Sequence, residues 1–294
     1  MTPEATAKTI REAYVQASSF LRAAGVEEAE VSVRRLLALQ LGVPDAELLW
    51  RFPEPFPTAA EEKWQARLAR RAAGEPLQYI TGEQEFYGLS FQVSPAVLIP
   101  RPETELLVEA IARHGGRLWP EGAPLAADIG TGSGAIVVTL ATLCPAWQLA
   151  AVDLSPDALA VARENAAHHG AADRIRWLQG DLLAPLAEAG LAPDILVSNP
   201  PYIPSADISG LMREVRDHEP HLALDGGPDG LIPYRRMVEQ LDQLAAVPRL
   251  VGFELGQGQA DAVEALLRST GRFEWTEQIV DYAGIPRHVV AGTG

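Results

Sequence analysis

The feature that most constrains the fold is an alternation of apolar, strand-like runs with helical patterns from Leu125 to the end of the chain. A strand that leads into a helix and then into another strand favours parallel pairing, with helices covering both faces of the sheet. The sequence therefore predicts an α/β fold. Strands are expected at 125–129, 148–153, 175–178, 194–198, 250–255, 274–280 and 287–291, the last two closing the sheet as a hairpin.

A glycine-rich loop follows the first of these strands and leads into an apolar helix expected at 135–143. Such a loop lets the backbone approach a ligand closely at a helix N-terminus. The next strand ends at Asp153, about 20 residues after the loop, where an acidic side chain can bind ribose hydroxyls. Asp-Ile-Gly-Thr-Gly-Ser-Gly differs from the Gly-x-Gly-x-x-Gly of dinucleotide sites, which cradle a pyrophosphate, and this favours S-adenosylmethionine. The expected cofactor-binding residues are Asp128, Gly130, Thr131, Gly132, Ser133, Gly134, Asp153, Leu182 and Asn199.

The third strand ends at Gly180-Asp181. In this position Asp181 places Leu182 beside the adenine of the expected cofactor. A second interpretation is open, because aspartate is also common in turns and at helix caps.

The fourth strand stops at the sequence Asn199-Pro200-Pro201-Tyr202. Proline has no N–H to donate to a ladder, so the strand should leave the Asn199 amide at its carboxyl edge, where open α/β sheets bind ligands. A plain proline turn after a strand would show the same residues.

Beside a methyl donor, this strand end is suited to hold a planar amino group. The Asn199 side-chain carbonyl and the Pro200 backbone carbonyl can each accept one N–H, and Tyr202 can pack against the group. Amide and exocyclic amino nitrogens are poor nucleophiles because their lone pairs are delocalised, so positioning should carry most of the catalysis. The expected catalytic residues are Asn199, Pro200 and Tyr202, and the expected acceptor-binding residues are Asn199, Pro200, Pro201 and Tyr202.

The first part of the chain has a different pattern. Helical periodicity predicts a small bundle at residues 1–75, with a cap at Thr2-Pro3 and a capping box at Thr58 and Glu61. Short strands are expected at 79–81, 86–93 and 97–99, which gives a β-hairpin connector at 76–100. Residues 101–294 form the α/β domain in this division.

Composition limits the partners and the setting. The formal net charge of −15 argues against a surface built to neutralise a run of phosphates. Cys144 is the only cysteine, which excludes an intrachain disulfide and favours a reducing, cytoplasmic setting. The sequence shows neither a signal peptide nor a membrane helix. His218 and His221 have a metal-like spacing, but Pro220 between them and the absence of an obvious third ligand predict a loop and no metal.

The Asn199–Tyr202 segment resembles the signature of methyltransferases that act on the amino groups of adenine, cytosine or glutamine. Other segments are similar to the PrmC (HemK) family of peptide-chain-release-factor glutamine N5-methyltransferases. These segments are Pro76–Gly82, Phe86–Gly88, Val97–Glu105, Glu219-Pro220, Ala223-Leu224, Gly226–Leu231 and Tyr234-Arg235. The resemblance covers nearly the whole chain, although the first 75 residues match in helical character more than in motif.

The resemblance implies the fold of an S-adenosylmethionine-dependent methyltransferase, Rossmann-like with a seven-stranded, mainly parallel sheet. It also implies methylation of the glutamine in the Gly-Gly-Gln loop of bacterial class 1 peptide chain release factors 1 and 2. Carried over residue by residue, it places Gly130–Gly134, Asp153 and Leu182 at the cofactor and Asn199–Tyr202 at the glutamine amide. Arg101 and Glu105 are expected to support the cofactor pocket. The helical residues 1–75 are expected to recognise the substrate, and the protein is expected to be a monomer.

Two other functions are weighed against this one. A DNA adenine-N6 methyltransferase would share the Asn-Pro-Pro-Tyr chemistry, but it needs a basic target-recognition region and room for a flipped base, and the acidic chain shows neither. A non-catalytic adaptor that retained the fold is disfavoured because the Asn199 segment is intact.

Overall fold

The structure is a computed structural model that describes residues 8–294, so the helix cap expected at Thr2-Pro3 lies outside the described residues. The chain divides into two compact units. One comprises the described residues up to Gly82 together with Met212–His218, and the other comprises Glu83–Leu211 and Glu219–Gly294.

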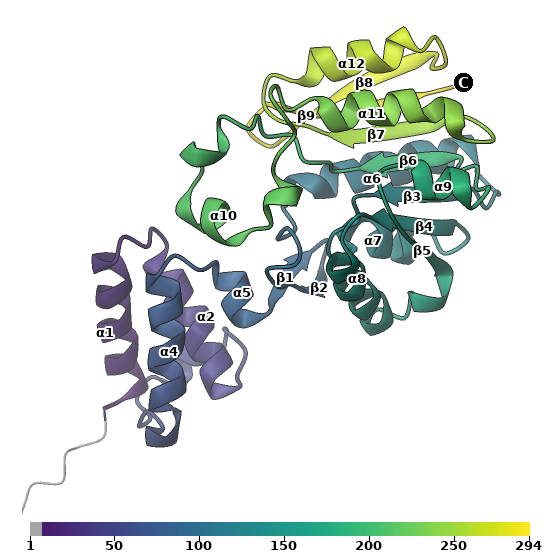
Figure 1. Cartoon of the computed structure of the whole chain (residues 1–294). Helices are drawn as coiled ribbons and strands as arrows, with labels where there is room; N and C mark the ends of the chain where they lie inside the picture. Colours follow the sequence, from purple (N-terminus) through teal and green to yellow (C-terminus); the bar gives the residue numbers. More distant parts are fainter. Residues whose placement is uncertain (1–7) are drawn as a thin grey trace, which may run out of the picture. The chain divides into compact units, whose positions relative to one another are not determined.

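The first unit is a helical bundle around a core that includes Leu21, Leu36 and Trp64. Its helices are α1 (Ile10–Ala23), α2 (Ala29–Leu41), α3 (Leu48–Arg51), α4 (Glu61–Ala72), α5 (Leu77–Thr81) and α10 (Arg213–His218), and most are labelled in Figure 1.

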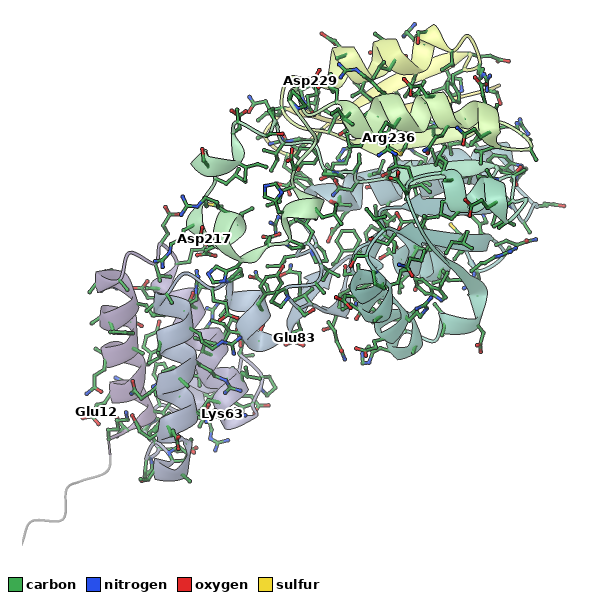
Figure 2. The ribbon with its side chains drawn as sticks, viewed as in Figure 1. Glu12, Lys63, Glu83, Asp217, Asp229 and Arg236 are labelled. Carbon is green, nitrogen blue, oxygen red and sulfur yellow. The ribbon has the colours of Figure 1, made fainter. Side chains whose placement is uncertain are left out.

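A capping box is present in this unit, but at a different helix from the one expected. Thr9 caps α1 and pairs reciprocally with Glu12, which lies in the first turn of that helix (Figure 2). The box expected at Thr58 and Glu61 is wrong, because Thr58–Ala60 forms a 3-10 turn and α4 begins only at Glu61 without a side-chain cap.

Helix α10 belongs to the first unit although the residues on either side of it belong to the second. Its Glu214 accepts a hydrogen bond of 2.6 Å from Nη2 of Arg71, whose side chain is buried. Arg71 also donates to Ser32 Oγ at 3.1 Å and to the Glu75 carbonyl at 3.0 Å. A buried guanidinium needs such partners, so this network attaches the 212–218 segment to the bundle.

The connector expected at 76–100 is only partly a hairpin. Strands β1 (Glu83–Phe86) and β2 (Leu89–Gln92) pair antiparallel. The strand expected at 79–81 is wrong, because this stretch is in α5, which follows Pro76 and ends at Gly82 with a φ of 86°. Proline before a short apolar run and glycine after it are helix start and stop signals, and they decide the conformation here. No strand forms at 97–99 within the described chain.

In the second unit, seven strands of the described chain form one sheet with the order β5-β4-β3-β6-β7-β9-β8. The strands are β3 (Leu125–Ile129), β4 (Gln148–Asp153), β5 (Ile175–Gln179), β6 (Ile195–Ser198), β7 (Leu250–Glu254), β8 (Trp275–Val280) and β9 (Pro286–Gly292). Strands β3 to β7 are parallel, whereas β8 and β9 add an antiparallel hairpin. This confirms the predicted mainly parallel α/β sheet.

Helices cover both faces of this sheet (Figure 1). Helices α6 (Glu103–Leu118), α7 (Ala135–Leu143) and α8 (Pro156–His168) bury one apolar face, and α9 (Ala184–Glu188), α11 (Ile232–Gln240) and α12 (Ala260–Ser269) bury the other. The strand order changes direction between β3 and β6, and ligands bind at such a switch point in open α/β sheets. The carboxyl ends of β3 and β6 are therefore the place to look for a site.

A buried side chain, Asn165, helps to attach the β1–β2 hairpin to the sheet layers. Asn165 of α8 accepts a hydrogen bond from the Gln92 backbone N–H at 2.7 Å and donates to the Gln92 carbonyl at 3.0 Å. Its amide also donates to the Ser133 carbonyl at 2.8 Å, in the glycine loop after β3. Asn165 thus connects the hairpin with the loop expected to bind the cofactor.

No helix in residues 8–294 is both long and apolar enough to cross a membrane.

We expect Asn165→Ala to destabilise the second unit by about 1–3 kcal/mol, because it leaves the buried Ser133 carbonyl without this partner and removes two partly buried hydrogen bonds to the Gln92 backbone. Urea unfolding measures the change, with Gln148→Ala at an exposed position as the control. Equal unfolding midpoints for the two variants would contradict the role given to Asn165.

Candidate active site

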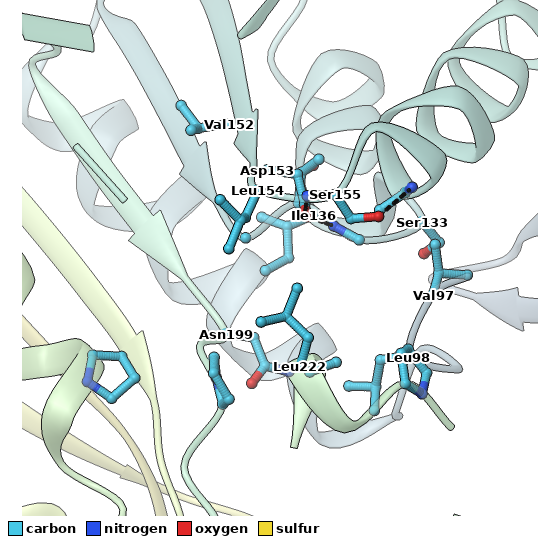
Figure 3. Close-up of a pocket in the computed structure, with 18 of the residues that line it drawn as sticks. Val97, Leu98, Ser133, Ile136, Val152, Asp153, Leu154, Ser155, Asn199 and Leu222 are labelled. Carbon is cyan, nitrogen blue, oxygen red and sulfur yellow. Dashed lines mark hydrogen bonds between the residues drawn. The ribbon is translucent and has the colours of Figure 1, made fainter. Parts of the chain in front are cut away.

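A cavity of about 430 Å³ opens at the switch point of the sheet. The glycine loop after β3, the ends of β4 and β5, and the segment after β6 all contribute to its wall. Figure 3 shows side chains from these segments around the cavity, with Asp153, Leu154 and Ser155 from the end of β4 and Asn199 from the end of β6. Most of the sequence-predicted site residues are thus brought to one place.

The glycine loop has a backbone conformation that glycine adopts readily. Gly130, Gly132 and Gly134 have φ values of 72°, 54° and 82°, which disfavour any side chain. A Cβ on Gly130 would point into open space, so this glycine is required by conformation and leaves room for a ligand. A Cβ on Gly134 would lie 3.2 Å from Ala162 Cβ, so this glycine lets α7 pack closely on α8 and does not line the cavity.

Asp153 is held by the loop that it faces. Its Oδ2 accepts a hydrogen bond of 2.8 Å from the Gly132 N–H, and its Oδ1 accepts one of 2.9 Å from the Ser155 N–H. Each oxygen keeps a lone pair for a further donor, such as a ribose hydroxyl. Burial raises the pKa of this carboxyl above its ordinary value.

Asp128 lies beneath the loop and does not line the cavity. It is 1% exposed and accepts a hydrogen bond of 2.6 Å from the Thr131 hydroxyl. Burial raises the pKa of Asp128 to about 7, and the nearby Asp153 carboxylate adds to the increase. Asp128 therefore acts on the site through Thr131 and its charge, and we assign it no direct ligand contact.

The segment after β5 adds a strained residue to the cavity wall. Leu182 has a φ of 51°, which is unusual for a residue other than glycine. Its neighbour Asp181 forms an ion pair with Arg236 of α11, a residue labelled in Figure 2. Asp181, Leu182 and Arg236 all line the cavity, so the ion pair helps to hold Leu182 against the ligand space.

The four residues of the Asn-Pro-Pro-Tyr segment have different positions. β6 ends at Ser198, and Asn199 and Pro201 line the cavity. Pro200 is buried, while Tyr202 is half-buried and packs against the apolar face that α11 and α12 cover. The Tyr202 carbonyl accepts a hydrogen bond of 2.9 Å from Gln259 Nε2, which fixes the chain after the prolines.

The Tyr202 hydroxyl is not equipped to act as a base near neutral pH. The pKa of Tyr202 is raised to about 12, mainly by burial and also by the nearby Glu254 carboxylate. The phenol therefore keeps its proton, and packing is the role open to this side chain.

Two glycines of the 226–231 segment permit close packing against the chain after Asn199. A Cβ on Gly226 would lie 2.8 Å from both the Pro201 carbonyl oxygen and Tyr202 Cα, and a Cβ on Gly230 would collide with the Tyr202 carbonyl oxygen. Main-chain hydrogen bonds join the two segments, from Ile203 N–H to the Leu224 carbonyl at 3.0 Å and from Gly226 N–H to the Ile203 carbonyl at 2.9 Å. This pairing braces the Asn-Pro-Pro-Tyr segment from behind.

An ion pair positions another part of the 203–230 loop. Arg101 Nη2 lies 2.5 Å from Oε1 of the buried Glu219, and Nη1 of the same guanidinium donates to the Ile99 carbonyl at 2.9 Å. Arg101 lines the cavity together with Pro220 and Leu222 from the residues after Glu219. Glu105 has a different role, because its carboxylate accepts a hydrogen bond of 2.7 Å from the Tyr87 N–H in the β1–β2 turn.

Several residues of the cavity wall were not singled out from the sequence. They are apolar or small, and in a sequence such residues cannot be distinguished from residues that pack in the core. The additional residues are Val97, Leu98, Thr104, Leu154, Ser155 and Leu222. Thr104 is a buried polar residue in the first turn of α6, and its burial is visible only in the structure.

We expect Gly226→Ala to destabilise the second unit by about 1–3 kcal/mol, because the added methyl group forces the backbone away from Pro201 and Tyr202. Activity at the cavity should fall by more than the loss of folded protein accounts for. Gly210→Ala is the matched control in the same loop, because a Cβ there meets nothing within 4 Å. Indistinguishable activities for the two variants would contradict the bracing role.

The raised pKa of Asp128 predicts a pH-dependent stability. The unfolded chain releases this proton at a pH of about 3.9, whereas the folded protein holds it until about 7. The folded state therefore binds the extra proton between these values, and raising the pH costs stability. Urea midpoints of the cofactor-free protein should fall relative to those of Asp128→Asn as the pH rises from about 4 to about 7. Parallel pH profiles would show that Asp128 ionises normally.

Family models match both parts of the chain. A model described as the PrmC N-terminal domain matches residues 12–82, and one described as a methyltransferase domain matches residues 126–218.

Curated relatives match over nearly the full length. A release factor glutamine methyltransferase of Moorella thermoacetica is 47% identical over 284 residues, which cover 96% of this chain and 98% of the relative. One of Geobacter sulfurreducens is 42% identical and covers 92% of each chain. Among solved structures, the human Mettl16 catalytic domain bound to an RNA hairpin matches with a TM-score of 0.55 at 19% identity, covering 78% of this chain and 82% of that one. At that identity the likeness shows the fold alone.

Proposed function

The chain belongs to the release factor glutamine methyltransferase family, and from this premise we propose the reaction in detail. The protein transfers the methyl group of S-adenosylmethionine to N5, the side-chain amide nitrogen, of the glutamine in the Gly-Gly-Gln motif of class 1 release factors. Peptide chain release factors 1 and 2 are the proposed substrates. The observation that carries the proposal is the Asn199 amide on the cavity wall beside the glycine loop.

The residues of the cavity fit S-adenosylmethionine, which supplies a methyl group on a positively charged sulfur. Asp153 offers two carboxylate oxygens for the ribose hydroxyls, and Leu182 offers an apolar surface to the adenine. The open space above Gly130 leaves room for the ligand beside the backbone of the glycine loop. The Asp153 carboxylate complements a cation, whereas the charge of Asp181 is balanced by Arg236.

The acceptor half of the proposed site is the Asn199–Tyr202 segment. The Asn199 side-chain oxygen and the Pro200 carbonyl accept the two N–H groups of the glutamine amide, which turns the face of the nitrogen toward the donor. The protein needs no strong base before the attack, because the amide proton becomes acidic only as the C–N bond forms and can then leave to water. The Tyr202 phenol stays protonated near neutral pH and so does not serve as a base, which agrees with catalysis by positioning.

We also propose a division of the chain into three parts, of which the first recognises the release factor. Residues 1–75 are the proposed substrate-recognition domain and residues 76–100 the connector, while the methyltransferase domain extends over 101–294. In the methyltransferase domain, the exposed Leu222 lies on the cavity wall, and we propose that the 219–230 part of the 203–230 loop forms a lip over the acceptor.

DNA adenine is the competing acceptor, since its amino group would satisfy the same two carbonyl oxygens. The net charge of −15 disfavours binding to a polyanion. Labelled cofactor incubated with this protein and either release factor or DNA decides between the two. We expect label in the release factor, and label in DNA alone would overturn the proposal.

Asn199→Ala should lower kcat on release factor by about 100-fold or more, because the acceptor amide is no longer oriented. Cofactor affinity, measured by calorimetry, should change little, since the glycine loop and Asp153 are intact. Asp153→Ala provides the reciprocal comparison and should weaken cofactor binding. Unchanged turnover by Asn199→Ala would refute the clamp.

A further inference from the structure

The Asn199 side chain has a hydrogen-bonding partner outside the Asn-Pro-Pro-Tyr segment. Its Nδ2 donates to Oγ1 of Thr104 at 3.2 Å. Thr104 lies in the first turn of α6, is 4% exposed and lines the same cavity. The two residues are 95 positions apart in the chain and approach each other only in the folded unit.

The orientation of this amide decides what it can bind. A carboxamide presents a carbonyl oxygen on one side and an NH₂ group on the other. The glutamine NH₂ is a donor, so Asn199 is useful to it only when its oxygen faces the cavity. If the Asn199 amide were rotated by half a turn, its NH₂ group would face the NH₂ group of the glutamine. Two hydrogen-bond donors would then oppose each other, and the glutamine would be repelled.

We propose that Thr104 is the positioning residue that selects the productive orientation of Asn199. By accepting from Nδ2, the Thr104 hydroxyl occupies the donor side of the amide and leaves Oδ1 for the substrate. This inference rests on the proposed function, because it assumes that the acceptor is an amino group.

The support behind Thr104 is rigid. Its backbone N–H donates to the Arg101 carbonyl at 3.1 Å, and Arg101 is held in turn by the buried Glu219. The pair Thr104 and Asn199 thus joins the start of α6 to the end of β6 at a fixed separation. Because Thr104 acts through Asn199, its removal should affect turnover and leave cofactor binding intact.

The chain offers a matched control. Thr139 of α7 is fully buried in the same unit, and its hydroxyl has no hydrogen-bond partner among the described residues. Thr104→Val and Thr139→Val therefore make the same near-isosteric change at two buried sites, but only the first removes a hydrogen bond to the site.

Steady-state kinetics on release factor test the proposal. We expect Thr104→Val to lower kcat by about 10–100-fold, with KM for release factor and cofactor affinity nearly unchanged. Thr104→Ser retains the hydroxyl and should restore most of the rate, and Thr139→Val should behave as wild type. Wild-type kcat in Thr104→Val, or an equal loss in Thr104→Ser, would overturn the positioning role.

A second measurement is independent of catalysis. The Asn199 side-chain NH₂ signal in an NMR spectrum of nitrogen-15-labelled protein can be assigned by its loss in Asn199→Ala. It should shift in Thr104→Val and stay close to its wild-type position in Thr104→Ser and Thr139→Val. An unmoved signal in Thr104→Val would refute the proposed hydrogen bond. Failure of wild-type protein to methylate release factor would instead refute the proposed function.

Discussion

The site depends on one backbone constraint, the end of β6 at two consecutive prolines. Because neither proline can donate to a ladder, pairing stops at Ser198 and the next side chain, Asn199, is left at the sheet edge. The neighbouring strand β3 ends in the glycine loop at the same edge, and the strand order reverses between the two. The sheet topology therefore brings the glycine loop and the Asn199 amide to the wall of one cavity.

The elements around this strand end serve to keep it in place. Gly226 and Gly230 allow a second segment to pack against Pro201 and Tyr202 from one side. On another side, α6 presents Thr104 to the Asn199 amide. A reaction with a weakly nucleophilic nitrogen gains most from such positioning, and a rigid frame with no activated base is what this chemistry requires.

Much of this organisation could be predicted from residues alone, because the signals were local. The strand–helix alternation predicted the mainly parallel sheet that the structure has. One local signal was misread. The short apolar stretch at 79–81 is compatible with either a strand or a helix, and the flanking Pro76 and Gly82 favour the helix that forms. The capping box of α1 was missed because the first helix was expected to begin several residues earlier.

What the sequence could not supply is contact between distant residues. The Thr104–Asn199 hydrogen bond and the Arg71–Glu214 ion pair join positions 95 and 143 residues apart, and no periodicity encodes them. Gly226 and Gly230 belong to a segment that the resemblance identified. The reason that glycine is needed there is the close approach of the Tyr202 backbone, which only the structure shows.

The central claim is that the Asn199 segment orients a protein glutamine for methyl transfer. Mass spectrometry of a class 1 release factor incubated with this protein and S-adenosylmethionine tests that claim most directly. We predict one added methyl group, which peptide fragmentation places on the side-chain amide of the Gly-Gly-Gln glutamine. A methyl group on another residue, or an unmodified release factor, would contradict the account.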